Sequence, residues 1–198
     1  MNKFLKELIE RYPQLNIISE DVEKAIEVIV DCYKSGGKLL LCGNGGSAAD
    51  CGHIVGELMK GFLKHRPTGS NDEVISKLQS GLPAVSLCES SALFTAFCND
   101  VDPNLVFAQQ VYALGKPNDI LIGITTSGNS KNVVAAAHTA KQIGMKVIGL
   151  VGGDGGKMNL ESDIALIVPE KETFKVQELH IAVYHCICAA VEGNFYYE

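Results

Sequence analysis

The sequence contains no tryptophan, and aromatic residues make up only 7% of its 198 residues. It also lacks an excess of positive charge, because 17 Lys and Arg stand against 23 Asp and Glu, a formal net charge of −6. The basic residues are scattered along the chain. A face that binds nucleic acid by neutralising phosphates needs them gathered together. We therefore expect no nucleic-acid partner.

Paired cysteines of the C-x-x-C kind are missing as well. The number of cysteines is odd, and most of them lie inside apolar runs: Cys32, Cys42, Cys51, Cys88, Cys98, Cys186 and Cys188. Such cysteines are typical of small buried thiols in a reducing compartment. A cysteine metal site lacks the paired spacing that it needs.

Long hydrophobic runs are also absent. No apolar stretch is long enough to span a bilayer, and the first residues, MNKFLKELIERYPQ, carry charges every few positions, unlike a signal peptide. We therefore expect a cytoplasmic protein with no membrane partner. The length suits one well-buried α/β domain and is short for two.

Five short apolar runs are present, and helix-length segments separate them. The runs cover residues 38–43, 82–87, 119–125, 146–152 and 164–169. They are continuous rather than alternating, as expected of strands that are covered on both faces. The clearest helical pattern lies between two of them, at 129–144, and ends at Gly144. This alternation predicts an α/β fold, a doubly wound, five-stranded parallel sheet flanked by helices.

A single domain over 1–198 is expected, because no linker or repeat interrupts the chain. It divides into an N-terminal helical part, a parallel α/β core and a C-terminal helix, at 1–37, 38–169 and 170–198. In the first part, helices are predicted at 2–12 and 20–35. Ser19 precedes the second helix as a candidate N-cap.

The C-terminal helix, clearest over 172–193, carries apolar residues around much of its circumference. One packed face needs fewer, so the pattern predicts an oligomer interface. The segment 64–81 is more polar. We expect it to leave the core as an excursion with a short helix at 72–80.

Two loops after predicted strands have the chemistry of an anion site. The first is Gly43-Asn44-Gly45-Gly46-Ser47, and the second is TTSGNS at 125–130. Glycine lets the backbone approach an anion, while N–H groups and hydroxyls donate to its oxygens. Neither loop matches the nucleotide triphosphatase or dinucleotide patterns.

Ordinary turn chemistry is the alternative for both loops. The second loop carries four hydroxyls within six residues, on Thr125, Thr126, Ser127 and Ser130. A helix N-cap needs only one of them. The density of hydroxyls therefore favours an anion, and a phosphate first of all.

His53 and Glu57 stand four apart on the helix that follows the first loop, so their side chains project from one face. A divalent metal or an acid/base couple suits such a pair, and a surface salt bridge is the alternative. The C-terminal helix offers a second cluster of Gln177, Glu178, His180 and His185. Because His185 lies among apolar residues, a core histidine is the alternative there.

Together, CGNGGS, the H-x-x-x-E that follows it, TTSGNS and VQELHIAVYH resemble the sugar isomerase (SIS) superfamily. Within it, the chain is most similar to the phosphoheptose isomerases, also called sedoheptulose 7-phosphate isomerases. The resemblance covers nearly the whole length. It implies a flavodoxin-like fold and a homotetramer with sites at subunit interfaces. It also implies aldose–ketose isomerisation of a phosphosugar through an enediolate.

The resemblance also implies roles for single residues. Glu57 would be the base and His185 the acid/base. The ligands of one Zn²⁺ per subunit would be His53, Glu57, Gln177 and His185. The phosphosugar would contact Asn44, Gly45, Gly46, Ser47, Asn99, Asp100, Thr125, Thr126, Ser127, Ser130 and Gln177. A helix-ending turn is the alternative reading of Asn99 and Asp100.

One geometric difficulty accompanies this ligand set. Gln177 and His185 stand eight residues apart, about 12 Å along a regular helix. Their side chains reach one metal only by leaning towards each other, or if different subunits contribute them.

The chain departs from the family pattern at two places. Phe174 stands where the better-known phosphoheptose isomerases carry an aspartate, and the segment 64–81 is longer than their loop. An isomerase of another phosphosugar is therefore one alternative. A non-catalytic protein of this fold is another, binding a phosphosugar or a protein partner as the DnaA initiator-associating proteins do. Because such proteins lose the catalytic pair and this chain keeps it, the pattern favours an enzyme.

Overall fold

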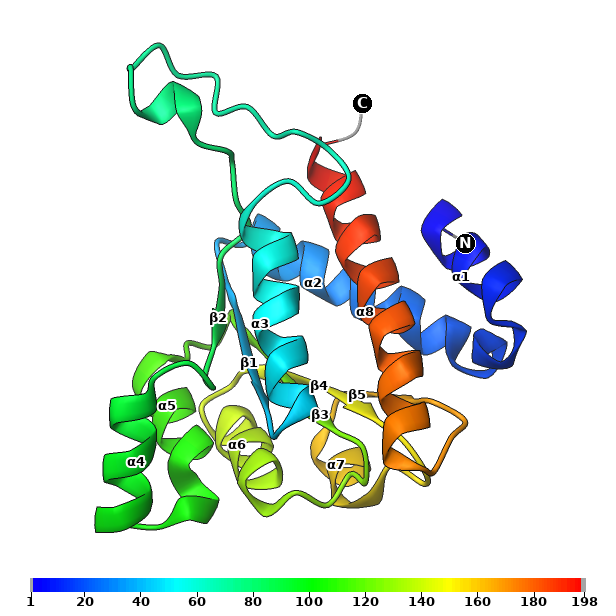
Figure 1. Ribbon diagram of the computed structural model, residues 1–198, viewed down its shortest axis with the longest axis vertical. Helices are drawn as coiled ribbons and strands as arrows, with labels where there is room; N and C mark the ends of the chain where they lie inside the picture. The colour runs from blue at the N-terminus through cyan, green and yellow to red at the C-terminus, as the bar shows by residue number, and fades with distance from the viewer. Residues whose placement is uncertain (1, 197–198) are drawn as a thin grey trace.

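The computed structural model describes residues 2–196, so residues 1, 197 and 198 of the predicted domain lie outside it. Its centre is a five-stranded parallel sheet in the order β2-β1-β3-β4-β5 (Figure 1). The strands are β1 (Leu39–Gly43), β2 (Ala84–Ser86), β3 (Ile120–Thr125), β4 (Lys146–Val151) and β5 (Ile164–Ile167). Every strand lies inside a predicted apolar run, which confirms the doubly wound parallel sheet.

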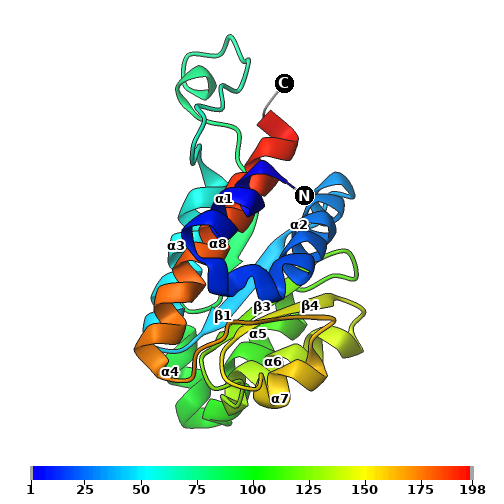
Figure 2. The same cartoon turned by 90° about the vertical axis from the view of Figure 1, so that its right-hand side faces the viewer.

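Both faces of the sheet are covered by helices, and its side chains alternate between two cores. Leu39 and Leu41 face one core, and Leu40 and Cys42 face the other. The first face is covered by α1 (Lys3–Arg11), α2 (Ser19–Lys34), α3 (Gly46–Met59) and α8 (Thr173–Tyr196). The second is covered by α5 (Val106–Leu114), α6 (Lys131–Gln142) and α7 (Gly156–Glu161). Figure 2 shows these layers from the side.

Shorter elements complete the fold. The helix α4 (Ser91–Asp100) leads into α5 through the 3₁₀ turn η3 (Pro103–Leu105). Another 3₁₀ turn, η1 (Pro13–Ile18), follows α1 after Tyr12 and runs directly into α2. For that reason the predicted N-cap at Ser19 is wrong: Ser19 is already helical, and no side chain caps the start of α2. The cap that does form in this region is Asn2, whose Oδ1 accepts from Phe4 N at 2.9 Å.

The long C-terminal helix is confirmed as α8, and it is the element that the others surround. Half of its length, twelve residues, is buried within the single chain. The neighbouring α1, α2 and α3 pack along it (Figure 2). The apolar circumference is therefore largely explained by contacts inside the chain. It is a weaker argument for an oligomer than the sequence pattern suggests.

The excursion at 64–81 projects away from the body of the molecule (Figure 1). The short helix predicted at 72–80 is wrong, because only a 3₁₀ turn, η2 (Ile75–Lys77), forms there. The Asp72 carboxylate accepts from the N–H groups of Val74 and Ile75, both at 2.9 Å. The turn buries no residue, so nothing packs against it to stabilise a longer helix.

Within the described residues, 2–196, no helix combines the length and apolar character that crossing a bilayer requires.

Candidate functional site

The two predicted anion loops follow neighbouring strands. β1 pairs with β3 in parallel, and Gly43 lies opposite Ile124 at the carboxyl end of the pair. In the strand order β2-β1-β3-β4-β5, β2 is added on one side of β1 and β3 on the other, so the order of successive strands reverses between β1 and β3. Ligands of doubly wound sheets bind at this reversal, beyond the carboxyl ends of the strands. The fold therefore places both loops where a ligand is expected.

In the first loop, Gly45 is required by the backbone conformation, and Gly46 leaves room for a neighbouring side chain. Gly45 has φ +57° and ψ −122°, a conformation that other residues rarely adopt. At Gly46, a Cβ atom would lie 2.5 Å from Gln177 Nε2, so a larger residue would displace the end of the Gln177 side chain. Ser47 is buried in the first turn of α3. This loop brings Gln177 to the beginning of α3.

In the second loop, the hydroxyls of Thr125 and Ser130 lie 2.9 Å apart. Ser130 occupies the N-cap position of α6, but its side chain makes no capping bond. Among the described contacts, Val133 N donates to Asn132 Oδ1 at 3.0 Å, while the N–H groups of Lys131 and Asn132 have no side-chain acceptor. Free N–H groups at the start of a helix favour an anion. Thr126 is half-buried and Ser127 is exposed, so both hydroxyls are accessible.

A reciprocal pair of amide hydrogen bonds joins the first loop to α6. Asn44 Nδ2 donates to Asn132 Oδ1, and Asn132 Nδ2 donates to Asn44 Oδ1, both at 2.9 Å. The first loop is thus tied to the first turn of α6, directly after the second loop. We name residues 43–47 and 125–130 the phosphate cradle, after the ligand that the sequence predicts for them. Asn132 was not predicted, because nothing in its local sequence marks a partner 88 residues away.

His53 and Glu57 from α3 meet His185 from α8. One ligand atom from each of these side chains lies within 4.8 Å of the others. His53 Nε2 is 3.2 Å from Glu57 Oε1 and 3.3 Å from His185 Nε2. We name these three residues the His–Glu–His cluster. The pair on α3 is thus part of a three-residue cluster and not an isolated salt bridge.

His53 is oriented by Tyr184, which in turn is hydrogen-bonded to Asp50. The Tyr184 hydroxyl donates to Asp50 Oδ1 at 3.2 Å and lies 2.9 Å from His53 Nδ1. Since its proton goes to Asp50, the hydroxyl accepts from His53 Nδ1–H. This tautomer leaves the lone pair of His53 Nε2 directed at the cluster.

The ionisation of these groups agrees with this arrangement. Burial, reinforced by the charge of Asp50, raises the pKa of Tyr184, so its hydroxyl stays neutral. Burial also raises the pKa of Asp50, although the bond from Tyr184 opposes the rise. Burial together with the nearby His53 lowers the pKa of His185. A neutral His185 is able to accept a proton or to bind a metal.

The donor set of the cluster is suitable for zinc. Zn²⁺ prefers imidazole nitrogen and carboxylate oxygen, and two histidines with one glutamate are ligands of known zinc sites. The predicted fourth ligand, Gln177, lies instead against Gly46 at the start of α3. His53 is seven residues further along that helix, about 10 Å. Within the described chain, three of the four predicted ligands therefore meet.

The remaining predicted contacts lie elsewhere. Asn99 and Asp100 end α4, where the Asn99 amide donates to the Asp100 carboxylate at 2.9 Å. They make no hydrogen bond to the cradle among the described contacts. A cavity of about 280 Å³ does connect the first loop with the beginning of α4, where Ser91 and Thr95 line it.

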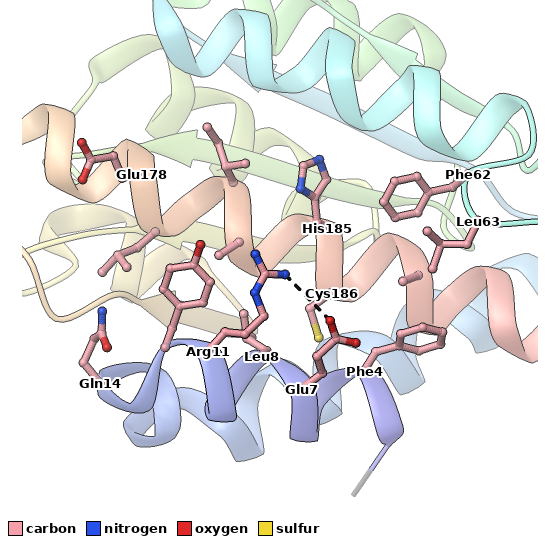
Figure 3. Close-up of a pocket in the computed structure, with 15 residues that line it drawn as sticks. Phe4, Glu7, Leu8, Arg11, Gln14, Phe62, Leu63, Glu178, His185 and Cys186 are labelled. Atoms are coloured by element: carbon pink, nitrogen blue, oxygen red, sulfur yellow. Dashed lines mark ion pairs between the residues drawn. The ribbon is translucent and has the colours of Figure 1, made fainter.

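A second cavity borders the cluster from another direction. It has a volume of about 680 Å³ and lies between α1 and α8 (Figure 3). His185 and Phe62 line one part of it, while Arg11 from α1 lines another. No residue of the phosphate cradle lines this cavity.

Comparison with known proteins shows the family of this chain. A family model of the SIS domain matches residues 3–152. The phosphoheptose isomerase of Helicobacter pylori strain P12 is 42% identical over 181 residues, covering 91% of this chain and 88% of the relative. That of Aliarcobacter butzleri is 43% identical over 180 residues, with coverage of 91% and 88%.

Solved structures give the same result. The phosphoheptose isomerase of Neisseria gonorrhoeae superposes with a TM-score of 0.80 at 37% identity, covering 95% of this chain and 94% of its own. The enzyme of Francisella tularensis superposes with a TM-score of 0.78 at 32% identity, covering 94% and 93%. The resemblance inferred from the four motifs is therefore confirmed. The chain belongs to the SIS domain family, among the phosphoheptose isomerases.

Proposed function

We propose that the protein converts sedoheptulose 7-phosphate to D-glycero-D-manno-heptose 7-phosphate through an enediolate. Its family membership makes it a phosphosugar isomerase; the heptose and the residue roles are the proposal. The observation that carries them is that Glu57 and His185 meet although they lie far apart in the sequence. Glu57 is on α3, the helix that begins at the phosphate cradle, and His185 is on α8.

The separation of cradle and cluster suits a long substrate. The start of α3 holds one part of the cradle, and His53 follows seven residues later, about 10 Å along the helix. In a heptose 7-phosphate, the reacting carbons C1 and C2 are at the opposite end of the chain from the phosphate. Binding the phosphate in the cradle therefore directs C1 and C2 towards the cluster.

Isomerisation requires one proton to move between carbons and another between oxygens. Glu57 takes a proton from C1 of the ketose while the carbonyl at C2 becomes an enediolate. His185 takes the proton of O1 and gives it to O2. Glu57 then returns its proton to C2, which leaves the aldehyde at C1.

Asn99 and Asp100 belong to the proposal as contacts to the sugar, as do Asn44, Gly45, Gly46, Ser47 and Gln177. The cradle hydroxyls of Thr125, Thr126, Ser127 and Ser130 would donate to the phosphate oxygens. These contacts act mainly on binding, because the phosphate does not change during the reaction.

His53, Glu57 and His185 would hold Zn²⁺, with Gln177 as the fourth ligand, either by leaning along α8 or from another subunit. When bound, the ion supplies positive charge that stabilises a neighbouring oxyanion. We place the protein in the cytoplasm as a homotetramer with subunits completing each other's sites, and with neither nucleic acid nor membrane as a partner.

An isomerase of a different phosphosugar is the second candidate. Phe174 favours it, because its side chain is 59% exposed one turn before Gln177, at the position where the family carries an aspartate. A purely binding role is disfavoured, since it has no use for a convergent Glu57 and His185.

The test is to incubate the purified protein with sedoheptulose 7-phosphate, with and without added Zn²⁺, and to follow the aldose by NMR. Turnover that increases with Zn²⁺ supports the substrate and the metal together. A folded, zinc-loaded protein that leaves this sugar unchanged overturns the heptose assignment, and other ketose phosphates are then assayed in the same way.

A further inference from the structure

Arg66 and Glu192 form a buried ion pair near the end of α3, and the proposed reaction does not use it. The guanidinium of Arg66 is 2.9 Å from Glu192 Oε1, and the two residues are only 1% and 0% exposed. Arg66 comes from the base of the excursion and Glu192 from the last turns of α8. Figure 1 shows how the excursion leaves the body of the molecule beside the end of α8.

Arg66 holds the end of α3. Its Nη1 donates to the carbonyl of Leu58 at 2.7 Å, and its Nη2 donates to the carbonyl of Glu57 at 3.3 Å. The last carbonyls of a helix have no partner within the helix, so these bonds complete the final turn of α3. That turn carries the Glu57 side chain. The position of Glu57 is thus coupled to the position of Arg66.

Glu192 holds the chain that leads out of α3. Its two carboxylate oxygens accept from Phe62 N and Leu63 N, each at 2.8 Å. The Phe62 ring stacks on His185, with ring centroids 5.6 Å apart and an interplanar angle of 28°. Figure 3 shows Phe62 beside His185 at the rim of the cavity. The position of His185 is thus coupled to Glu192.

The energetics of such a pair favour a role in geometry over one in stability. Burial alone would raise the pKa of Glu192, but the bonds from Phe62 and Leu63 and the charge of Arg66 lower it, so the carboxylate remains ionised. Removing two charges from water costs most of what their attraction returns. Apolar side chains of similar size often stabilise a protein equally well.

We propose that the Arg66–Glu192 pair positions Glu57 and His185 relative to each other, through the end of α3 and through the Phe62 ring. The two act as positioning residues, because Arg66 reaches the cluster only at the Glu57 backbone carbonyl and Glu192 reaches it only through Phe62. This inference rests on the proposed function of the cluster. It assigns a role in catalysis to the base of the excursion.

The test uses two variants of the full chain. The double substitution Arg66→Met, Glu192→Leu removes the pair without leaving one buried charge alone. Phe62→Leu removes only the stacking on His185. For both we expect kcat to fall at least tenfold with KM changed less than about twofold, and the Kd of Zn²⁺ to rise about tenfold, as for other outer-shell changes.

The matched control is Leu121→Ala, which opens a cavity in the core on the opposite face of the sheet. It loses stability without touching the pair, so its kcat and its Kd for Zn²⁺ should be retained at a temperature where it is folded. If the double variant does not fold, Phe62→Leu decides alone. Retention of both kcat and Zn²⁺ affinity by the folded variants overturns the proposal.

One readout separates this proposal from the proposed function. The His185 ring resonances of the metal-free protein report its surroundings without any substrate. A wild-type protein that does not convert the sugar contradicts the proposed function alone. The positioning role is contradicted instead if Phe62→Leu leaves these resonances and the Zn²⁺ affinity unchanged.

Discussion

At the scale of the residue, His53 is oriented by a chain of hydrogen bonds. Replacing Tyr184 by Phe removes the donor of the buried Asp50 and the partner of His53 Nδ1. We expect the free energy of unfolding to fall by about 1–3 kcal/mol, the cost of an unsatisfied buried group. The affinity for Zn²⁺ should fall about tenfold. Urea unfolding and a competition titration with a chelator measure the two effects.

Tyr33→Phe is the matched control, because the Tyr33 hydroxyl is buried and has no hydrogen-bond partner among residues 2–196. Its removal should leave the stability unchanged or raise it, and should not affect the metal. Equal losses of Zn²⁺ affinity in the two variants would contradict the role of Tyr184.

The two proposed proton-transfer groups give the sharpest prediction for activity. Glu57→Gln and His185→Ala should each lower kcat by at least a hundredfold, because general acid–base catalysis contributes factors of this order. Both variants should keep the fold and the oligomeric state of the wild type, whichever state that is. His138→Ala serves as control, since His138 lies on the far side of the sheet from the cluster. There its Nδ1 is 3.6 Å from Glu161 Oε2. Near-normal turnover in both site variants would contradict the assignment.

His180 predicts a dependence of stability on pH. Its ring nitrogens are buried and make no hydrogen bond of ordinary geometry within the described part of the chain, and burial lowers its pKa from 6.5 to about 4. Between these values the unfolded chain binds the extra proton, so the free energy of unfolding falls as the pH falls. One pKa unit corresponds to about 1.4 kcal/mol, so this residue removes about 2 kcal/mol between pH 7 and pH 5.

The measurement compares urea unfolding of the wild type and of His180→Leu at the two pH values. The variant should lose about 2 kcal/mol less than the wild type, as expected from the same shift. A loss of equal size in both proteins would show that other groups cause the decline.

The residues of the cluster could be predicted, whereas those that hold them could not. His53 and Glu57 lie on one helix at a spacing that the sequence displays, and His185 lies in a motif. Tyr184 and Asp50 are 134 residues apart, and Arg66 and Glu192 are 126 apart. No periodicity links positions so distant, so only the folded chain reveals these bonds.

At the scale of the element, the strands could be predicted because they are buried on both faces and therefore read as continuous apolar runs. The same reasoning fails for 72–80. That segment has helical composition but no surface to pack against, and a helix shorter than about twelve residues is marginal alone. The secondary structure of the projecting excursion therefore depends on the lack of neighbours to pack against more than on its own sequence.

The tip of the excursion can therefore be removed. Joining Thr68 to Gln79 through two glycines deletes residues 69–78 and leaves Arg66 in place. None of the deleted residues is buried, and Val74, for example, is 66% exposed. We expect the free energy of unfolding to change by less than about 0.5 kcal/mol, as for most surface changes. Thermal unfolding and turnover of the shortened chain test this. A large loss of either would show that the tip contacts the site or a second subunit.

At the scale of the whole molecule, the proposed phosphate-binding residues and the proposed catalytic residues lie on different parts of the fold. The cradle lies at the carboxyl ends of β1 and β3, and the cluster lies between α3 and α8. Thr126→Val combined with Ser127→Ala should therefore raise KM at least tenfold and leave kcat within about threefold. Each hydrogen bond to a charged phosphate contributes about 1.5–3 kcal/mol to binding. These bonds act equally in the ground state and the transition state, so their loss changes KM and not kcat. The Kd of Zn²⁺ should not change. Thr139→Val, which removes a hydroxyl bonded to the Ala135 carbonyl of the same helix, is the control. An unchanged KM in the double variant would remove the second loop from the site and leave the first loop alone to bind the phosphate.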